Sequence, residues 1–134
     1  MNVVDTSVVI AAFASWHELH ERARAALAER PGVVAHSALE TYSVLTRLPG
    51  PHRVSGDVVA TFLEHAFDLP LTLDRRVQQQ LVRRLVEAGV EGGAVYDGLI
   101  AATAQRHGAT LLTLDARAAL TYRRCGVTFE LLTA

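Results

Sequence analysis

Short apolar runs alternate along the chain with longer segments in which apolar side chains recur every three or four positions. The short runs are bounded by Gly, Pro or polar residues and predict strands at 3–4, 33–35, 69–73, 110–114 and 127–132. The longer segments predict helices at 6–13, 16–29, 37–48, 55–67, 75–88, 96–107 and 116–124. Strands that alternate with helices in this way are typical of an α/β fold with a parallel central sheet.

The composition favours one folded domain over residues 1–134. Half of the 134 residues are apolar, and no Gly-rich, Pro-rich or low-complexity linker divides the chain. No charge-free stretch near the start is long enough to span a membrane, and we expect a cytoplasmic protein. Cys125 is the single cysteine, so an internal disulfide is excluded.

The basic residues narrow the possible chemistry more than the net charge does. The net charge of −1 does not by itself indicate a nucleic-acid binder. All thirteen basic residues are arginine, and the chain has no lysine. A P-loop nucleotide hydrolase depends on a lysine, so this class is excluded.

Four acidic residues occupy positions where this architecture brings a ligand site together. Asp5 follows the first predicted strand and Asp115 follows the fourth, while Asp97 and Glu40 lie in the first turns of two predicted helices. In open α/β sheets, ligands bind at the carboxyl edge of the strands. We therefore expect these four side chains to lie near one another.

Each of these acids also has a structural explanation. Asp5, Asp97 and Asp115 could each accept hydrogen bonds at a helix N-terminus. Ser37 and Glu40 have the spacing of a capping box. Asp74 ends a segment LTLD just as Asp115 does, which shows how readily this pattern arises without a site.

Considered together, the four acids favour a metal site. Their motifs contain no basic partner, and a buried carboxylate between two apolar runs, such as Asp5, needs a positive or hydrogen-bonding neighbour. Carboxylates without cysteine or paired histidine ligands suit hard cations such as Mg²⁺ or Mn²⁺. Electrostatic repulsion within such a site would lower the stability of the metal-free fold, and we expect Asp5 to contribute to that repulsion.

Three segments resemble the PIN-domain ribonucleases, and among them the VapC-type toxins of VapBC toxin–antitoxin pairs. They read DTSVVIAAF, SALETYSVLTRLP and YDGLIAATAQRHGATLLTLDARA, and they occur in the order and spacing of that family. The resemblance implies a three-layer α/β/α sandwich with a short parallel sheet of order 3-2-1-4-5. In that order Asp5 and Asp115 follow neighbouring strands, whereas Asp74 follows a strand at the edge.

The resemblance also implies a function and assigns residues to it. It implies a Mg²⁺- or Mn²⁺-dependent endoribonuclease that is the toxin of a type II toxin–antitoxin system. The implied catalytic and metal-binding residues are Asp5, Glu40, Asp97 and Asp115, and the implied supporting hydroxyls are those of Thr6, Ser7 and Thr113. Implied partners are RNA, a cognate antitoxin and a second copy of the chain, with higher assembly in the antitoxin complex.

One departure from the family pattern concerns the second metal. Some relatives carry a further acid just after the last one, where this chain has Ala116, Arg117 and Ala118. Two bound ions are therefore less firmly implied than one.

Five arginines are candidates for contacts to RNA phosphates: Arg47, Arg75, Arg76, Arg83 and Arg84. The four that belong to the helix predicted over 75–88 form two pairs about two turns apart, so they share a similar face. A solvated helix face explains the same pattern equally well.

Two other functions compete with the nuclease. One is a PIN-like binding module without catalysis. The other is a phosphotransfer or phosphatase domain that uses Asp5 as the phosphoryl acceptor. Haloacid-dehalogenase-like phosphatases have a second aspartate where this chain has Ser7, and such enzymes normally need a lysine, which this chain lacks.

Overall fold

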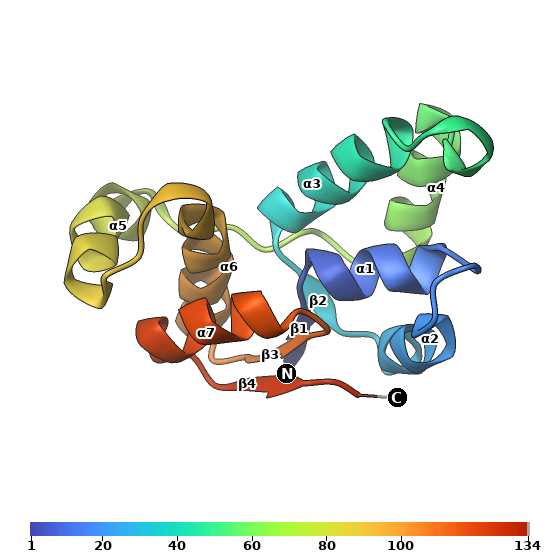
Figure 1. Cartoon of the computed structure of the whole chain (residues 1–134). Coiled ribbons are helices and arrows are strands. Elements are labelled where there is room, and N and C mark those ends of the chain that lie inside the picture. Colours follow the sequence, from blue (N-terminus) through green and yellow to red (C-terminus); the bar gives the residue numbers. More distant parts are fainter. Residues whose placement is uncertain (134) are drawn as a thin grey trace.

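A four-stranded parallel sheet lies at the centre of the computed structural model, which describes residues 1–133 (Figure 1). The strands are β1 (Asn2–Val4), β2 (Gly32–Val33), β3 (Thr110–Thr113) and β4 (Phe129–Leu131). They are ordered β2-β1-β3-β4, so the N-terminal strand is internal: Val3 pairs with Gly32 on one side and with Leu111 on the other. The end of the predicted domain, Ala134, lies outside the described residues.

The strand predicted at 69–73 is reduced to one bridge. Leu71 pairs in parallel with Val34, and its backbone N–H donates to the carbonyl of Val33 over 2.8 Å. Pro70 has no N–H to donate and Leu69 is exposed, so pairing cannot extend toward the N-terminal side. Including this bridge at the β2 edge, the sheet keeps the predicted 3-2-1-4-5 order.

Seven helices and two short 3₁₀ turns connect the strands within the described residues. The helices are α1 (Thr6–Phe13), α2 (His20–Ala28), α3 (Ala35–Thr46), α4 (Gly56–Ala66), α5 (Arg75–Ala88), α6 (Val95–Arg106) and α7 (Ala116–Cys125). The 3₁₀ turns are η1 (Gly50–His52) and η2 (Gly92–Ala94). None of these helices has the length and apolar character needed to cross a bilayer.

One predicted helix starts later than its hydrophobic spacing indicates. The segment 16–29 is helical only from His20, because residues before it form turns. Trp16, which belongs to this hydrophobic spacing, is 53% exposed and lies outside the core. Its ring packs against that of His52, with centroids 4.6 Å apart.

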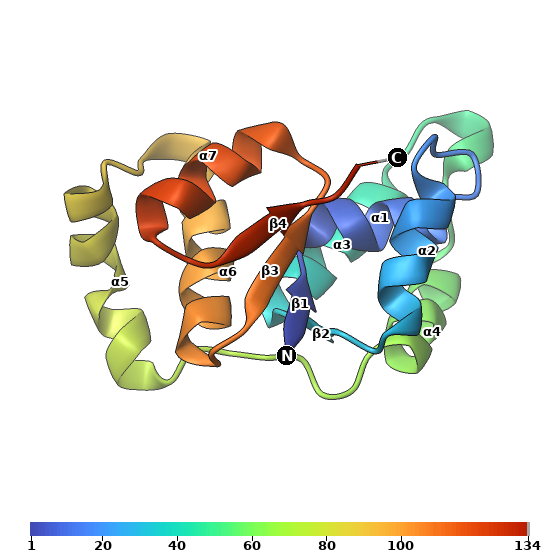
Figure 2. The ribbon, with the colours of Figure 1, turned by 90° about the horizontal axis from the view of Figure 1, so that it is seen from below.

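Helices cover both faces of the sheet, as the alternation of its buried side chains requires. Val4 and Leu112 point to the face covered by α1, α2 and α4, whereas Val3 and Leu111 point to the face covered by α6 and α7. Figure 2 shows the sheet between these two groups of helices. The predicted three-layer α/β/α sandwich is confirmed.

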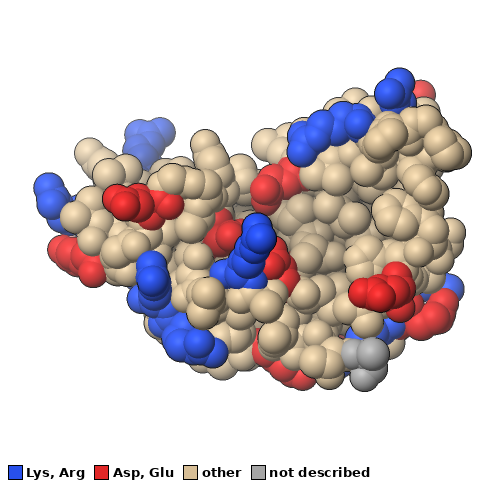
Figure 3. Space-filling view, viewed as in Figure 1, with Lys and Arg blue, Asp and Glu red and all other residues tan. Residues whose placement is uncertain are grey.

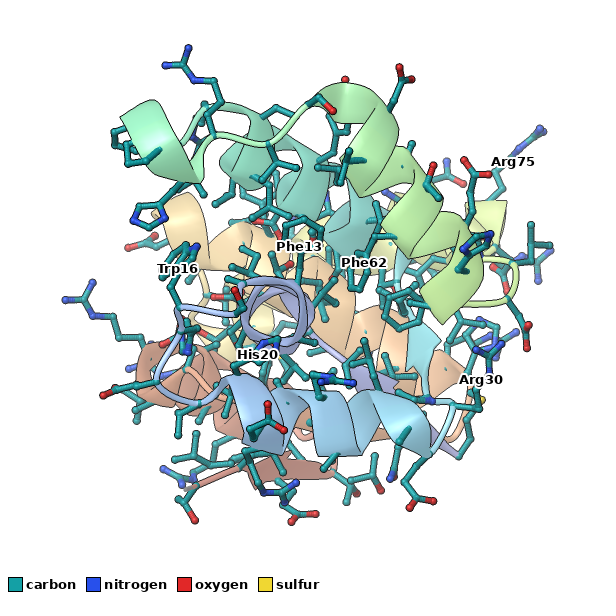
Figure 4. All side chains as sticks on the ribbon, turned by 90° about the vertical axis from the view of Figure 1, so that its right-hand side faces the viewer. Phe13, Trp16, His20, Arg30, Phe62 and Arg75 are labelled. Atoms are coloured by element: carbon teal, nitrogen blue, oxygen red, sulfur yellow. The ribbon has the colours of Figure 1, made fainter. Side chains whose placement is uncertain are left out.

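An aromatic pair and the hydrogen bonds of one arginine link the helices on the α1 side of the sheet (Figure 4). Phe13 at the end of α1 meets Phe62 of α4 edge to face, with ring centroids 5.1 Å apart. Arg30 follows α2 with a left-handed backbone (φ 55°), and its guanidinium donates to the carbonyl of His65 near the end of α4. The ends of α2 and α4 are thereby linked.

A glycine allows α5 to pack closely on α6. A Cβ atom at Gly98 would overlap the end of the Leu85 side chain, so glycine allows this approach without any shift of that side chain. Leu81 and Leu85 of α5 are buried against Ala102 of α6. Helices α5 and α6 thus form one arm of the molecule, opposite the arm formed by α3 and α4 (Figure 1).

Candidate active site

The four predicted carboxylates line one cleft of about 270 Å³ at the carboxyl edge of the sheet. Its lining residues are Asp5, Thr6, Ser7, Ile10, Glu40, Asp97, Asp115 and Ala118. Figure 3 shows acidic side chains gathered in the hollow between the two arms. No arginine of the described chain belongs to this lining, so the negative charge inside the cleft has no cation from the cleft walls.

Asp5 is buried and caps α1. Its Oδ1 accepts hydrogen bonds from the backbone N–H groups of Ser7 (3.0 Å) and Val8 (3.4 Å), as well as from the Ser7 hydroxyl (2.5 Å). The capping interpretation of Asp5 is therefore correct. Helix capping explains the hydrogen bonds of only one of the two Asp5 carboxylate oxygens, Oδ1.

The second oxygen of Asp5 accepts a hydrogen bond from a residue that the sequence did not single out. The hydroxyl of Tyr122, on α7, donates to Asp5 Oδ2 over 2.7 Å, and the tyrosine is completely buried. Burial raises the pKa of Asp5, while hydrogen bonds from Ser7, Thr113 and Tyr122 lower it and offset part of that effect.

Two of the predicted supporting hydroxyls link the ends of β1 and β3. The Ser7 hydroxyl accepts from the N–H of Leu114 (2.9 Å) and lies 3.4 Å from Thr113 Oγ1. Thr113 Oγ1 in turn accepts from the N–H of Asp115 (3.0 Å). Because these bonds cross between two strand ends, they fix the position of Asp115 relative to Asp5.

Asp115 caps α7 and keeps one oxygen free. Its Oδ1 accepts from the N–H groups of Arg117 (2.8 Å) and Ala118 (3.4 Å). Its Oδ2 has no hydrogen-bond partner among residues 1–133 and remains available to a ligand of the cleft. The capping interpretation is again correct but incomplete.

Asp97 does not cap a helix. It lies in the first turn of α6, but the N-cap is Ala94 and no side chain caps that end, so the capping interpretation is wrong here. Burial and then the charges of Asp5, Glu40 and Asp115 raise the pKa of Asp97 to about 6. This shift indicates that the four carboxylates interact electrostatically.

Glu40 lies in the second turn of its helix rather than in the first. Helix α3 begins at Ala35, because Val34 leaves the sheet with an extended backbone as the N-cap. Ser37 is thus inside the helix, and the predicted capping box is wrong. Glu40 Oε1 instead accepts from the Thr6 hydroxyl (2.8 Å) and lies 3.5 Å from His36 Nε2.

The donor set fits a hard divalent cation. Carboxylate and hydroxyl oxygens line the cleft, and these are the ligands that Mg²⁺ and Mn²⁺ prefer. Across residues 1–133, no group of three or more His, Cys, Asp or Glu side chains is arranged as a ready metal site.

The five candidate arginines lie outside the cleft. All are exposed: Arg47, Arg75, Arg76, Arg83 and Arg84. Arg47 donates to Ser43 (2.7 Å) and Arg84 to Gln105 (3.1 Å). Their contact with RNA remains a prediction.

Asp74 is held far from the other carboxylates. It caps α5 by accepting from the N–H of Val77 (2.9 Å), which lowers its pKa, and it pairs with Arg106 (3.1 Å). Arg106 ends α6, about 13 Å along the helix from Asp97. The two similar LTLD segments therefore occupy different environments.

Sequence reasoning missed Tyr122 and His36. Tyr122 follows Asp115 by about two helical turns, and this spacing could have indicated its burial but not the partner of its hydroxyl. His36 stacks on Tyr96, with ring centroids 5.1 Å apart and planes 4° from parallel. No signal in the sequence relates these two rings.

Comparisons with known proteins agree with this geometry. The PIN-domain model matches residues 3–123. Ribonuclease VapC40 of Mycobacterium tuberculosis is 48% identical over 130 residues, covering 96% of this chain and 97% of the relative. Ribonuclease VapC27 of the same organism is 43% identical over 125 residues, covering 92% and 91%.

Solved structures show the same fold at low identity. The crystal structure of FitAcB from Neisseria gonorrhoeae matches with a TM-score of 0.68 and 23% identity, over 96% of each chain. VapBC2 from Rickettsia felis, bound to a DNA fragment from its promoter, matches with a TM-score of 0.69 and 14% identity, over 98% of each chain. Together with the family model and the ribonuclease relatives, these matches show that the chain belongs to the PIN-domain family.

Proposed function

We propose that this chain is a Mg²⁺- or Mn²⁺-dependent endoribonuclease and the toxin of a type II toxin–antitoxin pair. The observation that carries this proposal is the cleft in which the charges of three carboxylates help to raise the pKa of a fourth, Asp97, to about 6. The two VapC relatives, both named ribonucleases, support the reaction class.

In this proposal Asp5, Glu40, Asp97 and Asp115 hold the cation. A bound divalent ion lowers the pKa of a water ligand and neutralises charge on a phosphodiester. Thr6 orients Glu40, while Ser7 and Thr113 hold the two strand ends that carry Asp5 and Asp115. The exposed arginines would contact the RNA backbone outside the cleft, where their charge does not compete with the cation.

The first test measures RNA cleavage and thermal stability with and without metal. We expect cleavage of single-stranded or looped RNA in Mn²⁺ or Mg²⁺ and none in chelator. We also expect millimolar Mn²⁺ to raise the melting temperature, because a ligand that binds only the folded state stabilises it. At a metal concentration about 100 times the Kd, this effect amounts to roughly 2.7 kcal/mol.

Ca²⁺ and a pool of unrelated RNAs serve as controls in this test. A melting temperature that ignores Mn²⁺ would contradict the metal site. Metal binding without cleavage of any RNA pool would favour a PIN-like binding module instead.

The antitoxin is the second proposed partner. FitAcB and VapBC2 are complexes whose fold this chain shares, which supports an antitoxin partner for this chain. We expect an antitoxin segment to place an arginine in the acidic cleft, since a guanidinium pairs with two carboxylate oxygens at once.

This expectation is checked by replacing each arginine of the antitoxin tail with glutamine and measuring both affinity and inhibition. We expect one replacement to weaken binding at least tenfold, equivalent to about 1.4 kcal/mol. Unchanged inhibition after all replacements would rule out this mode of recognition.

We also propose a homodimer, with higher assembly in the antitoxin complex. Large apolar side chains are exposed on both arms, with Leu39 70% exposed on α3 and Val82 72% exposed on α5. Apolar side chains that are exposed singly are common on monomeric proteins, so the proposed homodimer rests on the family resemblance, and Leu39 and Val82 are candidate contacts within it. Sedimentation of the isolated chain as a monomer would contradict this assembly.

A further inference from the structure

We propose that Tyr122 is a positioning residue whose hydroxyl holds Asp5 in place as a ligand for a divalent cation. This inference rests on the proposed metal-dependent function and adds to it a residue outside the four acids. Tyr122 does not line the cleft; it acts through Asp5 from behind.

The contacts of Asp5 restrain its carboxylate from two sides. Ser7 and Val8 hold Oδ1 from the first turn of α1, whereas the Tyr122 hydroxyl holds Oδ2 from α7. Rotation about the Cβ–Cγ bond would break hydrogen bonds to both oxygens. Asp5 therefore has a fixed orientation in the metal-free protein.

The chemistry of a phenol suits this task. A buried tyrosine hydroxyl needs an acceptor, and Asp5 Oδ2 lies 2.7 Å away. Each carboxylate oxygen has about two lone-pair sites, so one hydrogen bond leaves Oδ2 able to bind a cation. A lysine or arginine here would neutralise Asp5, whereas a neutral donor preserves the charge that attracts the cation.

The same helix also carries a second proposed ligand. Asp115 caps the N-terminus of α7, and Tyr122 lies on the buried face of that helix about two turns later. The Tyr122 ring lies 6.1 Å from that of Phe129, against the sheet. Packing of α7 on the sheet thus sets the positions of Asp115 and of the hydroxyl that holds Asp5.

The test replaces only the hydroxyl. Tyr122→Phe keeps the buried ring, and Tyr42→Phe removes a hydroxyl from a partly exposed tyrosine outside the cleft as the matched control. We expect Tyr122→Phe to weaken Mn²⁺ binding, measured by calorimetry, by about tenfold or more, as is typical when a partner of a metal ligand is lost. The kcat for RNA should fall while KM stays unchanged, and Tyr42→Phe should match the wild type in both measurements.

Two results for a folded variant would overturn the proposal. Unchanged Mn²⁺ affinity would mean that Tyr122 only fills space. Tighter binding would mean that its hydroxyl competes with the cation for Oδ2. Melting curves in chelator establish that the variant is folded before affinities are compared.

A second measurement uses the wild-type sequence and does not depend on the stability of the variant. The chain has three tyrosines, so 3-fluorotyrosine labelling gives three ¹⁹F signals. On titration with Mg²⁺, the signal of Tyr122 should shift and that of Tyr42 should not. A Tyr122 signal that stays fixed while calorimetry records Mg²⁺ binding would refute the positioning role and leave the proposed function standing; if the wild type binds no metal, both proposals are wrong.

Discussion

Asp97→Asn is expected to abolish RNA cleavage and at the same time to raise the melting temperature of the metal-free protein at pH 7. Cleavage should be lost because a proposed metal ligand loses its charge, with a fall of several orders of magnitude. Stability should rise because the Asp97 carboxylate is partly desolvated and surrounded by Asp5, Glu40 and Asp115, and none of residues 1–133 donates a hydrogen bond to its side chain. Allowing for solvent screening, we expect about 1 kcal/mol and roughly 4 °C.

The pH dependence has a defined sign. The pKa of Asp97 is raised from 3.8 to about 6 in the folded protein, so the folded state binds more protons between these values than the unfolded state does. Stability from this group is therefore complete below pH 3.8 and is lost as the pH rises through 6. Asp97→Asn removes this loss of stability, so the melting temperature of the variant should exceed that of the wild type by the largest amount above pH 6.

Thermal melts in chelator from pH 4 to 8 measure this difference, and gel assays with Mn²⁺ measure cleavage. Asp57→Asn is the matched control, because Asp57 is exposed on α4 outside the cleft. It should cleave RNA like the wild type and should not gain stability as the pH rises. An Asp97→Asn variant that melts below the wild type at pH 7 would contradict the electrostatic interpretation of the cleft.

The second large effect is a difference in RNA cleavage between variants of the two LTLD segments. Asp115→Asn should abolish cleavage, because Asp115 lines the cleft and offers a free oxygen to the cation. Asp74→Asn should retain most of the activity, because Asp74 pairs with Arg106 at the far end of α6. Since asparagine also caps helices, the main loss at Asp74 is the ion pair, and we expect a small decrease in melting temperature.

The comparison is made at equal protein concentration with one RNA substrate, after circular dichroism has shown that both variants are folded. Each variant acts as the other's control, because the same substitution is made at the last residue of the same four-residue motif. Equal loss of activity in the two variants would mean that the cleft is not where RNA is cut.

Much of the fold could be predicted because its sheet is encoded in short apolar runs. The strand at Val3 and Val4, the helix after Asp5 and the parallel sheet all follow from this pattern, and the structure contains them. The strand at 69–73 could not be predicted correctly from hydrophobicity alone, because Pro70 removes a backbone donor.

The acidic residues of the site could be predicted from the sequence, but several of the hydrogen bonds that hold them could not. Acids after strands indicated where Asp5 and Asp115 would lie. The position of Glu40 was misjudged because α3 starts where the chain leaves the sheet at Val34, which depends on its pairing with Leu71. The Tyr122–Asp5 hydrogen bond joins opposite ends of the chain, and local patterns carry no information about such distant pairs.

The central position of β1 has a consequence for how this protein is made. Strand β1 leaves the ribosome before both of its neighbours, and it can pair with β2 well before β3, beginning at Thr110, covers its other side. Asp115 follows β3, and Tyr122, which holds Asp5, emerges later still. The acidic cleft therefore stays incomplete on the ribosome until β3, Asp115 and Tyr122 have all been synthesised.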